Sequence, residues 1–128
     1  MKLEELNIYK SADEISDTIW SIVETWDYYK KDTLGKQLVR AADSISANIA
    51  EGYGRFFFKE NRNFCYYSRG SLLETKNWLG KAFRRKMISN ETYNSLITDL
   101  DSLHKSLNGY IKYITQQASD KKPSKPIS

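Results

Sequence analysis

From Gln37 to Arg55 the chain reads QLVRAADSISANIAEGYGR, and this stretch decides the fold. Apolar residues recur in it every three or four positions, as on the buried side of an α-helix, and small residues form a second face. Because one helix carries apolar, small and polar faces at once, we expect it to be surrounded by protein, including other copies of this chain. The polar face, called here the polar row, consists of Gln37, Arg40, Ser44, Asn48, Glu51 and Arg55.

The composition of the whole chain suits one helical domain. Its 128 residues are enough for one core, and no proline precedes Pro123, so long helices can form without a break. The single cysteine, Cys65, has no partner for an intramolecular disulfide, which favours a reducing compartment. No segment approaches the roughly 20 apolar residues of a membrane span, and the N-terminus lacks a signal-peptide pattern. We therefore expect a soluble, cytoplasmic protein.

Apolar spacing predicts three further helices. The first follows a capping box at Ser11–Glu14 and ends near Lys30–Lys31, whose charges suit a helix C-terminus. Leu3, Leu6 and Ile8 before it either extend the helix or pack as a short lead-in. The third helix runs from about residue 58 to residue 86. The fourth begins at Ser89 or Asn90, either of which can cap it.

Glycines mark the end of the second helix and the interior of the third. The second helix begins at Asp32 or Thr33 and ends at Gly52-Tyr-Gly54, because glycine accepts a left-handed backbone at little cost. Gly70 and Gly80 lie inside the third helix, where each costs up to ~1 kcal/mol relative to alanine. We expect these two glycines to mark tight helix crossings.

Four helices joined by short turns predict an all-α fold over residues 1–117, an antiparallel up-down-up-down four-helix bundle. Two long hairpins exchanged between subunits would give the same pattern and remain the alternative. Residues 118–128 are polar and basic and contain both prolines, which predicts a disordered tail.

Charge is distributed unevenly along the chain. Residues 1–32 contain four Lys and Arg against eight Asp and Glu, whereas residues 33–88 contain eleven against four. One interpretation is that neighbouring helices or subunits pair these charges. The other is that the basic middle of the chain binds nucleic acid.

Within the basic middle, cations alternate with aromatic residues. Residues 55–69 read RFFFKENRNFCYYSR, and three more cations follow at residues 84–86. Cations neutralise phosphates and exposed rings stack on unpaired bases, although three successive phenylalanines are also typical of a core or an interface. We expect six residues to contact phosphates: Arg55, Lys59, Arg62, Arg84, Arg85 and Lys86.

We expect no catalytic activity. Asp101 and His104 have the spacing of one carboxylate–histidine metal motif, but di-iron bundles need two such motifs and further glutamates. Cys65 has no cysteine or histidine near it in sequence and is typical of a buried thiol. Gly52-Tyr-Gly54 follows a helix and not a strand, so it is not a phosphate-binding loop. The sequence therefore predicts no metal, cofactor, small-molecule substrate or membrane partner.

For the polar row we expect a structural role. Arg40 would pair with a carboxylate such as Glu74 or Glu51, and Ser44 and Asn48 would bond to backbone or neighbouring side chains, because half-buried polar groups need partners. The alternative is that the row contacts a ligand or RNA.

Two segments resemble one known family. Residues 38–55, LVRAADSISANIAEGYGR, resemble the motif of the 23S ribosomal RNA intervening-sequence proteins, often called four-helix bundle proteins. The block SRGSLLE at residues 68–74 lies at the distance expected in that family, and the resemblance covers about residues 6–114. The matching positions are Arg40, Ser44, Asn48, Glu51, Gly52, Gly54, Arg55, Gly70, Ser71 and Glu74.

Two positions depart from the family pattern. The family usually has a Ser or Thr helix cap where this chain has Phe57. It has an apolar residue after Glu60, where this chain has Asn61. Both departures concern the turn between the second and third helices and leave the expected fold unchanged.

The resemblance implies a bacterial, cytoplasmic four-helix bundle that assembles in some members as a homopentameric ring and has no catalytic residues. The resemblance extends to a related branch, the accessory variability proteins of diversity-generating retroelements. It implies a basic pentamer that engages nucleic acid and a reverse transcriptase. The sequence therefore supports two hypotheses. One is an oligomeric protein that binds RNA or DNA through its basic helices. The other is an interaction scaffold whose charges serve self-assembly or docking to a partner such as a reverse transcriptase.

Overall fold

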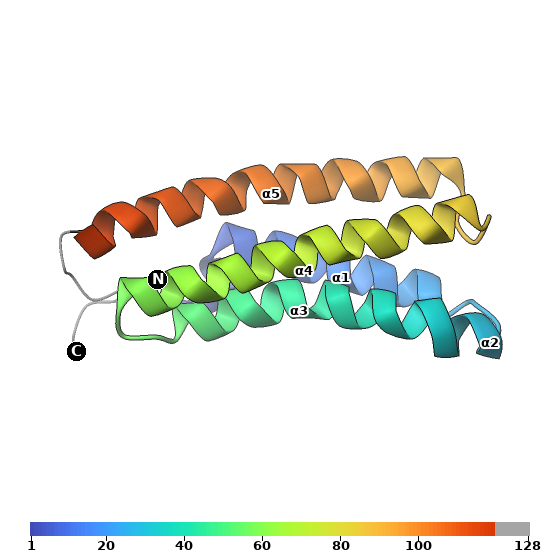
Figure 1. The fold of residues 1–128 in the computed structure, drawn as a ribbon, viewed down its shortest axis with the longest axis horizontal. Coiled ribbons are helices and arrows are strands. Elements are labelled where there is room, and N and C mark those ends of the chain that lie inside the picture. Colours follow the sequence, from blue (N-terminus) through green and yellow to red (C-terminus); the bar gives the residue numbers. More distant parts are fainter. Residues whose placement is uncertain (120–128) are drawn as a thin grey trace.

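The computed structural model describes residues 1–119, which form helices and no strand. Four long helices lie along one common axis (Figure 1), which confirms the predicted all-α fold. In chain order the elements are η1 (Leu3–Glu5), α1 (Asn7–Val23), α2 (Tyr28–Lys30), the π-helical turn η2 (Lys31–Gly35), α3 (Lys36–Tyr53), α4 (Phe58–Arg84) and α5 (Asn90–Ser119).

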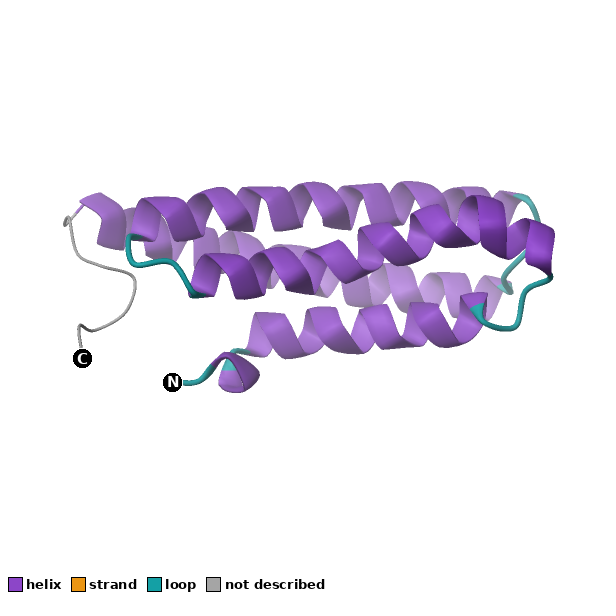
Figure 2. Cartoon of the chain, turned by 90° about the horizontal axis from the view of Figure 1, so that it is seen from below, coloured by secondary structure: helices purple, strands orange, loops and turns teal. Residues whose placement is uncertain are grey.

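Successive long helices connect at alternating ends of the molecule. α3 packs on α1 and α4, and α5 packs on α4 and α1. In Figure 1 α4 runs from left to right and α5 returns from right to left, and Figure 2 shows the connecting loops at both ends. The two ends of α4 therefore lie at opposite ends of the molecule.

The core runs between the four long helices. Each helix contributes a stripe of buried apolar residues spaced three or four positions apart. Full burial of each such leucine or isoleucine stabilises the fold by about 1.5–3 kcal/mol. The largest fully buried apolar side chains include Ile19, Leu38, Ile45, Ile49, Leu72, Leu79, Leu100, Leu107 and Ile114.

The first helix includes Ile8, as the alternative of an N-terminal extension predicted, whereas its predicted cap and its predicted end are wrong. α1 begins at Asn7, so Ser11 lies inside it and does not cap it. Ile8 and Ala12 are buried and extend the apolar stripe toward the N-terminus, which carries the helix past Ser11. α1 then ends at Val23, well before the predicted end.

The second helix starts earlier than predicted. Asp27 caps α2, because its Oδ1 accepts a hydrogen bond of 3.0 Å from the Lys30 backbone N–H. From there α2, η2 and α3 continue without a break, and the predicted caps Asp32 and Thr33 fall inside this run.

α3 ends at Gly52-Tyr-Gly54 as predicted, but not through the left-handed glycine that the sequence suggested. No glycine within residues 1–119 has a positive φ, and Gly54 ends α3 with a right-handed φ of −76°. The tight crossing lies at Gly52, where an added Cβ would stand 2.7 Å from Asn61 Oδ1 and 2.9 Å from Phe64 Cβ. At Gly70 an added Cβ would meet nothing within 4 Å, so the crossing predicted there is wrong.

Gly80 also departs from the prediction, because an added Cβ would meet only the flexible end of Arg84, at 3.2 Å. The left-handed residue that ends α4 is Lys86, with φ of 59°. Its neighbour Met87 donates a backbone hydrogen bond of 2.8 Å to the Ala82 carbonyl, as in a Schellman-type cap.

The start and the end of α5 can also be compared with the prediction. Ser89 caps α5, since its Oγ accepts a 3.1 Å hydrogen bond from the Thr92 backbone N–H, as predicted. Of the predicted tail at residues 118–128, Ala118 and Ser119 belong to α5 and the rest lies outside the described residues. Within the described part of the chain, no helix combines the length and apolarity needed to cross a bilayer.

Candidate nucleic-acid interface

The six predicted phosphate contacts form two clusters, one at each end of α4. Arg55, Lys59 and Arg62 lie at its start, whereas residues 84–86 lie at its end. A helix of 27 residues is about 40 Å long at 1.5 Å per residue. We call residues 55–70 the aromatic end and residues 84–86 the basic end.

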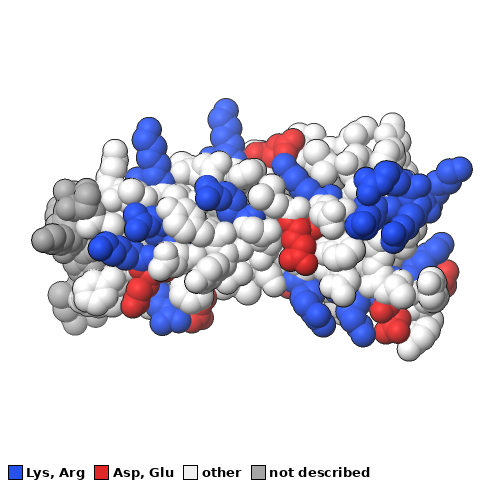
Figure 3. Space-filling model, in the orientation of Figure 1, with Lys and Arg blue, Asp and Glu red and all other residues white. Residues whose placement is uncertain are grey.

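The basic end consists of Arg84, Arg85 and Lys86, all exposed. None of them takes part in the ion pairs found within residues 1–119. Figure 3 shows Lys and Arg side chains gathering where α4 ends. Because Lys86 continues the run beyond the helix, three successive cations are available to an anionic partner.

Cations at the aromatic end are held by neighbouring groups. Arg55 Nη2 lies 2.7 Å from Glu51 Oε1, and its guanidinium lies 4.8 Å from the centroid of the Phe64 ring. Arg69 lies 5.1 Å from the centroid of the Tyr66 ring. Guanidinium groups therefore lie over aromatic rings on both flanks of α4.

Two further cations of the aromatic end differ from each other. Lys59 is exposed, as expected of a phosphate contact. Arg62 is half-buried, and its Nε is buried without a hydrogen-bond partner among the described residues. Arg69 was not among the predicted contacts, and its Nη1 donates a hydrogen bond of 2.9 Å to Asn108 Oδ1 of α5.

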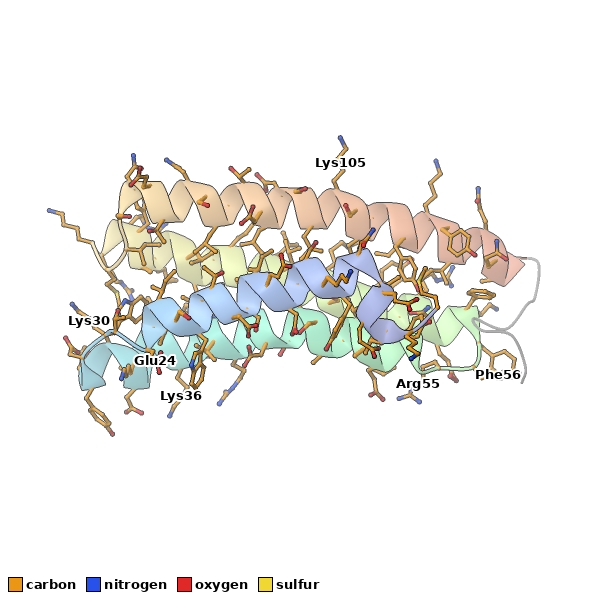
Figure 4. All side chains as sticks on the ribbon, turned by 180° about the vertical axis from the view of Figure 1, so that it is seen from behind. Glu24, Lys30, Lys36, Arg55, Phe56 and Lys105 are labelled. Carbon is orange, nitrogen blue, oxygen red and sulfur yellow. The ribbon has the colours of Figure 1, made fainter. Side chains whose placement is uncertain are left out.

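Most rings at the aromatic end are on the surface. Of the three successive phenylalanines only Phe58 is buried, while Phe56 and Phe57 are exposed and meet edge to face, with ring centroids 4.8 Å apart. Tyr66 and Tyr67 are exposed one turn before Gly70. Figure 4 shows Arg55 and Phe56 at this end, opposite Glu24, Lys30 and Lys36.

Beneath these rings lies a buried polar link between α4 and α5. Asn61, which replaces the apolar residue of the family pattern, is buried and donates a hydrogen bond of 3.3 Å to Tyr110 Oη. The Cys65 thiol donates to Asn61 Oδ1 at 3.7 Å. Burial raises the pKa of Tyr110. The buried side-chain amide of Asn61 therefore has hydrogen-bond partners on its own helix and on the adjacent helix.

Members of the polar row bond mainly within their own helix. Ser44 Oγ donates to the Arg40 carbonyl at 2.8 Å, and Asn48 Nδ2 donates to the Ser44 carbonyl at 2.9 Å. Arg40 takes no part in the ion pairs within residues 1–119, and Glu51, one of its expected partners, pairs with Arg55. Glu74, the other expected partner, instead accepts a hydrogen bond from Trp78 Nε1 at 3.3 Å.

A single chain does not enclose the polar row, so the expected enclosure by protein requires other copies of the chain. Gln37, Arg40 and Glu51 are exposed, and the other three members are half-buried. The row lies on the outer side of α3 because the apolar stripe and the small residues of that helix already face α1 and α4.

A groove between α1 and α3 was not predicted. It has a volume of about 750 Å³, and Arg40 and Ser44 of the polar row lie at one side of it. Trp20 lines the groove and is 57 % exposed. The available signal was that Trp20 directly follows the buried Ile19 and therefore points to another face of α1. The other lining residues are Val23, Glu24, Lys31, Gly35, Lys36, Val39, Asp43 and Ala47.

Cys65, Asp101 and His104 were considered for catalysis. Cys65 is fully buried, and burial raises the pKa of its thiol to about 12. His104 is half-buried, and Asp101 is paired with Lys76 of α4. Within residues 1–119 no group of three or more His, Cys, Asp or Glu could hold a metal ion.

Comparison with known proteins identifies the family. The chain is similar in structure to a protein of unknown function from the S23 ribosomal protein family of Bacteroides thetaiotaomicron, with a TM-score of 0.74 and 24% sequence identity. The alignment covers 82% of this chain and 98% of that chain, and supports the fold. None of the curated proteins matches the sequence. Residues 4–109 match the family of 23S rRNA-intervening sequence proteins, and this chain therefore belongs to that family.

Proposed function

We propose that this protein is a non-enzymatic, cytoplasmic homo-oligomer that binds RNA through α3 and α4. The observation that carries the proposal is the basic end, where Arg84, Arg85 and Lys86 are consecutive, exposed and outside the ion pairs of the described residues. Cations that are not neutralised by the protein attract phosphates and release their counterions on binding. The exposed Lys59 adds a fourth such charge at the other end of α4.

Salt dependence tests the proposal, because each neutralised phosphate contributes to the slope of log affinity against log salt. Replacement of both Arg84 and Arg85 by alanine removes two contacts and should flatten that slope by about 1.4 for single-stranded RNA. The matched control replaces two exposed lysines outside the basic middle, Lys10 and Lys105, and should leave the slope unchanged. Filter binding over a salt series measures both.

Two results would overturn RNA binding. The first is no retention of RNA at low salt by the unmodified protein. The second is that the Arg84 and Arg85 double variant binds with the same slope as the Lys10 and Lys105 control.

The second candidate function is an interaction scaffold, favoured by the groove between α1 and α3. A tryptophan exposed beside apolar residues in a groove of about 750 Å³ is typical of a contact surface. In this proposal a second copy of the chain covers the groove and the adjoining polar row. Each subunit is then an antiparallel up-down-up-down bundle in a ring, a pentamer as in some family members, which could also dock a reverse transcriptase.

Assembly is tested separately from RNA binding. Light scattering should give an oligomer for the unmodified protein and a smaller species for Trp20→Ser. Exposed Tyr28→Ser is the matched control and should leave the mass unchanged. A ring that falls apart as salt rises would support assembly driven by charge. A monomer at all concentrations would rule out the ring.

A further inference from the structure

We propose that the aromatic end binds unpaired nucleic-acid bases by stacking, so that the RNA is single-stranded where it meets this end. The inference rests on the proposed function and specifies its ligand. It assigns different roles to the two ends of α4, since the basic end offers only charge. Four observations support it.

The first observation is the combination of exposed rings with positive charge. Phe57 is 56 % exposed and Tyr67 is 59 % exposed. Residues 55–70 contain four cations and one carboxylate, Glu60. The buried centre of a protein–protein interface is depleted of charged residues, whereas surfaces for single strands combine aromatic rings with cations. This patch therefore suits a polyanion that carries flat bases.

The second observation is the position of the guanidinium groups. Arg55 lies over Phe64 and Arg69 lies over Tyr66, at 4.8 and 5.1 Å from the ring centroids. Arg69 is also anchored to Asn108 of α5. Bases stack on guanidinium groups as well as on aromatic rings, and here the two kinds of group lie next to each other. The cations are thus positioned as part of a stacking surface.

The third observation is the residue at the N-cap of α4. Phe57 occupies this position with extended dihedral angles, φ of −99° and ψ of 142°, and makes no side-chain cap hydrogen bond. A Ser, Thr, Asp or Asn would stabilise the helix there by about 0.5–2 kcal/mol. The chain instead places an exposed ring where a polar cap would favour stability.

The fourth observation is the exposed glycine on the same face. Gly70 follows Tyr66 by four residues and Tyr67 by three, so all three share one side of α4. An added Cβ would meet nothing within 4 Å, so packing within the chain does not require a glycine. Helical side chains lean toward the N-terminus, and a side chain at Gly70 would cover the two tyrosines. Its absence leaves them open to an external group.

A duplex cannot use this surface in the same way. Its bases are already stacked in pairs, and proteins recognise double-stranded RNA mainly through phosphates, hydroxyls and shape. A duplex would therefore bind through the cations alone. Because it also carries more phosphates than a single strand of equal length, any preference for the single strand must come from the bases.

The experiment measures fluorescence anisotropy with labelled oligouridine of about 12 nucleotides and with an RNA duplex of the same length. The double variant Phe57→Ser with Tyr67→Ser should lose at least about five-fold in affinity for oligouridine for each ring removed. Its affinity for the duplex should be unchanged. The matched control, Tyr28→Ser with Tyr29→Ser, removes two exposed rings at the other end of the molecule and should change neither affinity.

Serine at position 57 supplies the missing cap, whereas Tyr67→Ser removes an edge contact with Phe64, so thermal unfolding of the double variant checks its stability. A second variant leaves every ring in place. Gly70→Gln covers the tyrosines with a residue that favours helices and should weaken oligouridine binding. Gly109→Gln, at another exposed glycine with open space around it, should not.

The outcomes separate the two proposals. Equal affinity for oligouridine and duplex, with both unaffected by the Phe57 and Tyr67 changes, would overturn base stacking and leave RNA binding intact. A change of oligomeric mass in that double variant with no change in affinity would show that the rings are a contact between copies, and would also overturn stacking. If neither RNA binds at low salt, the proposed RNA-binding function itself is wrong.

Discussion

The two ends of α4 carry the same sign of charge in different settings. At the aromatic end Arg55 and Arg69 lie over rings, and a tight crossing with α3 and a buried link to α5 lie beneath them. At the basic end lie three exposed cations, the last of which is the left-handed Lys86. The difference teaches that the number of cations in a segment does not define a binding site. The rings and carboxylates around each cation decide what it can bind.

Both ends nevertheless share one property. Each has at its helix cap a residue that is poor for helix stability, Phe57 at the start and Lys86 in a left-handed conformation at the end. Positions where a chain departs from local rules are often functional sites. The departures place an exposed ring at one end and an exposed cation at the other.

The largest expected change in stability concerns the crossing of α3 and α4 at Gly52, which supports the aromatic end. Gly52→Ala should lower the free energy of unfolding by about 1–3 kcal/mol, because its Cβ would press against Asn61 and Phe64. Gly54→Ala is the control, since its nearest neighbour would be 3.5 Å away, an ordinary contact. Denaturant unfolding measures both. An equal, small effect of the two changes would show that no tight crossing supports this end.

Sequence reasoning succeeded where one local signal, apolar spacing or a helix cap, sets the boundary of a helix. The start of α4 at the buried Phe58 agrees with the apolar spacing, and the cap of α5 at Ser89 agrees with the chemistry of helix caps. It failed at the end of α1, where the half-buried Trp26 continued the apolar spacing across the break and hid the cap at Asp27.

The candidate site was predictable only as a list of residues. A glycine near a helix end indicates a left-handed cap, and only the packing of Asn61 against α3 reveals that Gly52 serves a crossing. Likewise, the sequence named Arg55 and Arg84 together as phosphate contacts, and the different surroundings of the two, at opposite ends of a helix of about 40 Å, appear only in the structure. The groove at Trp20 involves two helices and cannot be read from either alone.

The next effect depends on pH and concerns the buried thiol under the aromatic end. Unfolded Cys65 loses its proton near pH 9.0, whereas the folded thiol keeps it to about pH 12 because burial raises its pKa. The unfolded state then binds fewer protons, so stability is retained below pH 9 and falls as pH rises above it, by at most ~1.4 kcal/mol per pH unit.

Unfolding in urea between pH 8 and pH 11 measures this dependence. In the variant Cys65→Ala, the free energy of unfolding should no longer fall steeply with pH just above pH 9. Tyr110, whose pKa is also raised by burial, should keep a decline at higher pH in both proteins. A thiol reagent at pH 8 should label the native protein only through unfolding. Rapid labelling of the native thiol would contradict its burial.

A smaller change in stability is expected at Lys86 of the basic end. Lys86→Gly should raise the free energy of unfolding by about 1 kcal/mol, because a left-handed conformation costs L-residues roughly 1–2 kcal/mol and glycine little. The same change removes a proposed phosphate contact and should weaken RNA binding. Lys86→Ala is the matched control, since it removes the charge without relieving the backbone. Weaker binding by both, with only the glycine variant more stable, would separate charge from stability.

The smallest effect concerns the open face of the aromatic end. Gly70→Ala should stabilise the protein by about 0.5–1 kcal/mol, because alanine restricts the unfolded chain and its Cβ would meet no atom within 4 Å. Thermal unfolding measures the gain, with Gly109→Ala as the equivalent change on α5. The comparison of the two ends requires this face to be uncovered in the assembled protein. If Gly70→Ala destabilises the oligomer while Gly109→Ala stabilises it, another copy of the chain covers Tyr66 and Tyr67, and the aromatic end is a subunit contact and not a surface for bases.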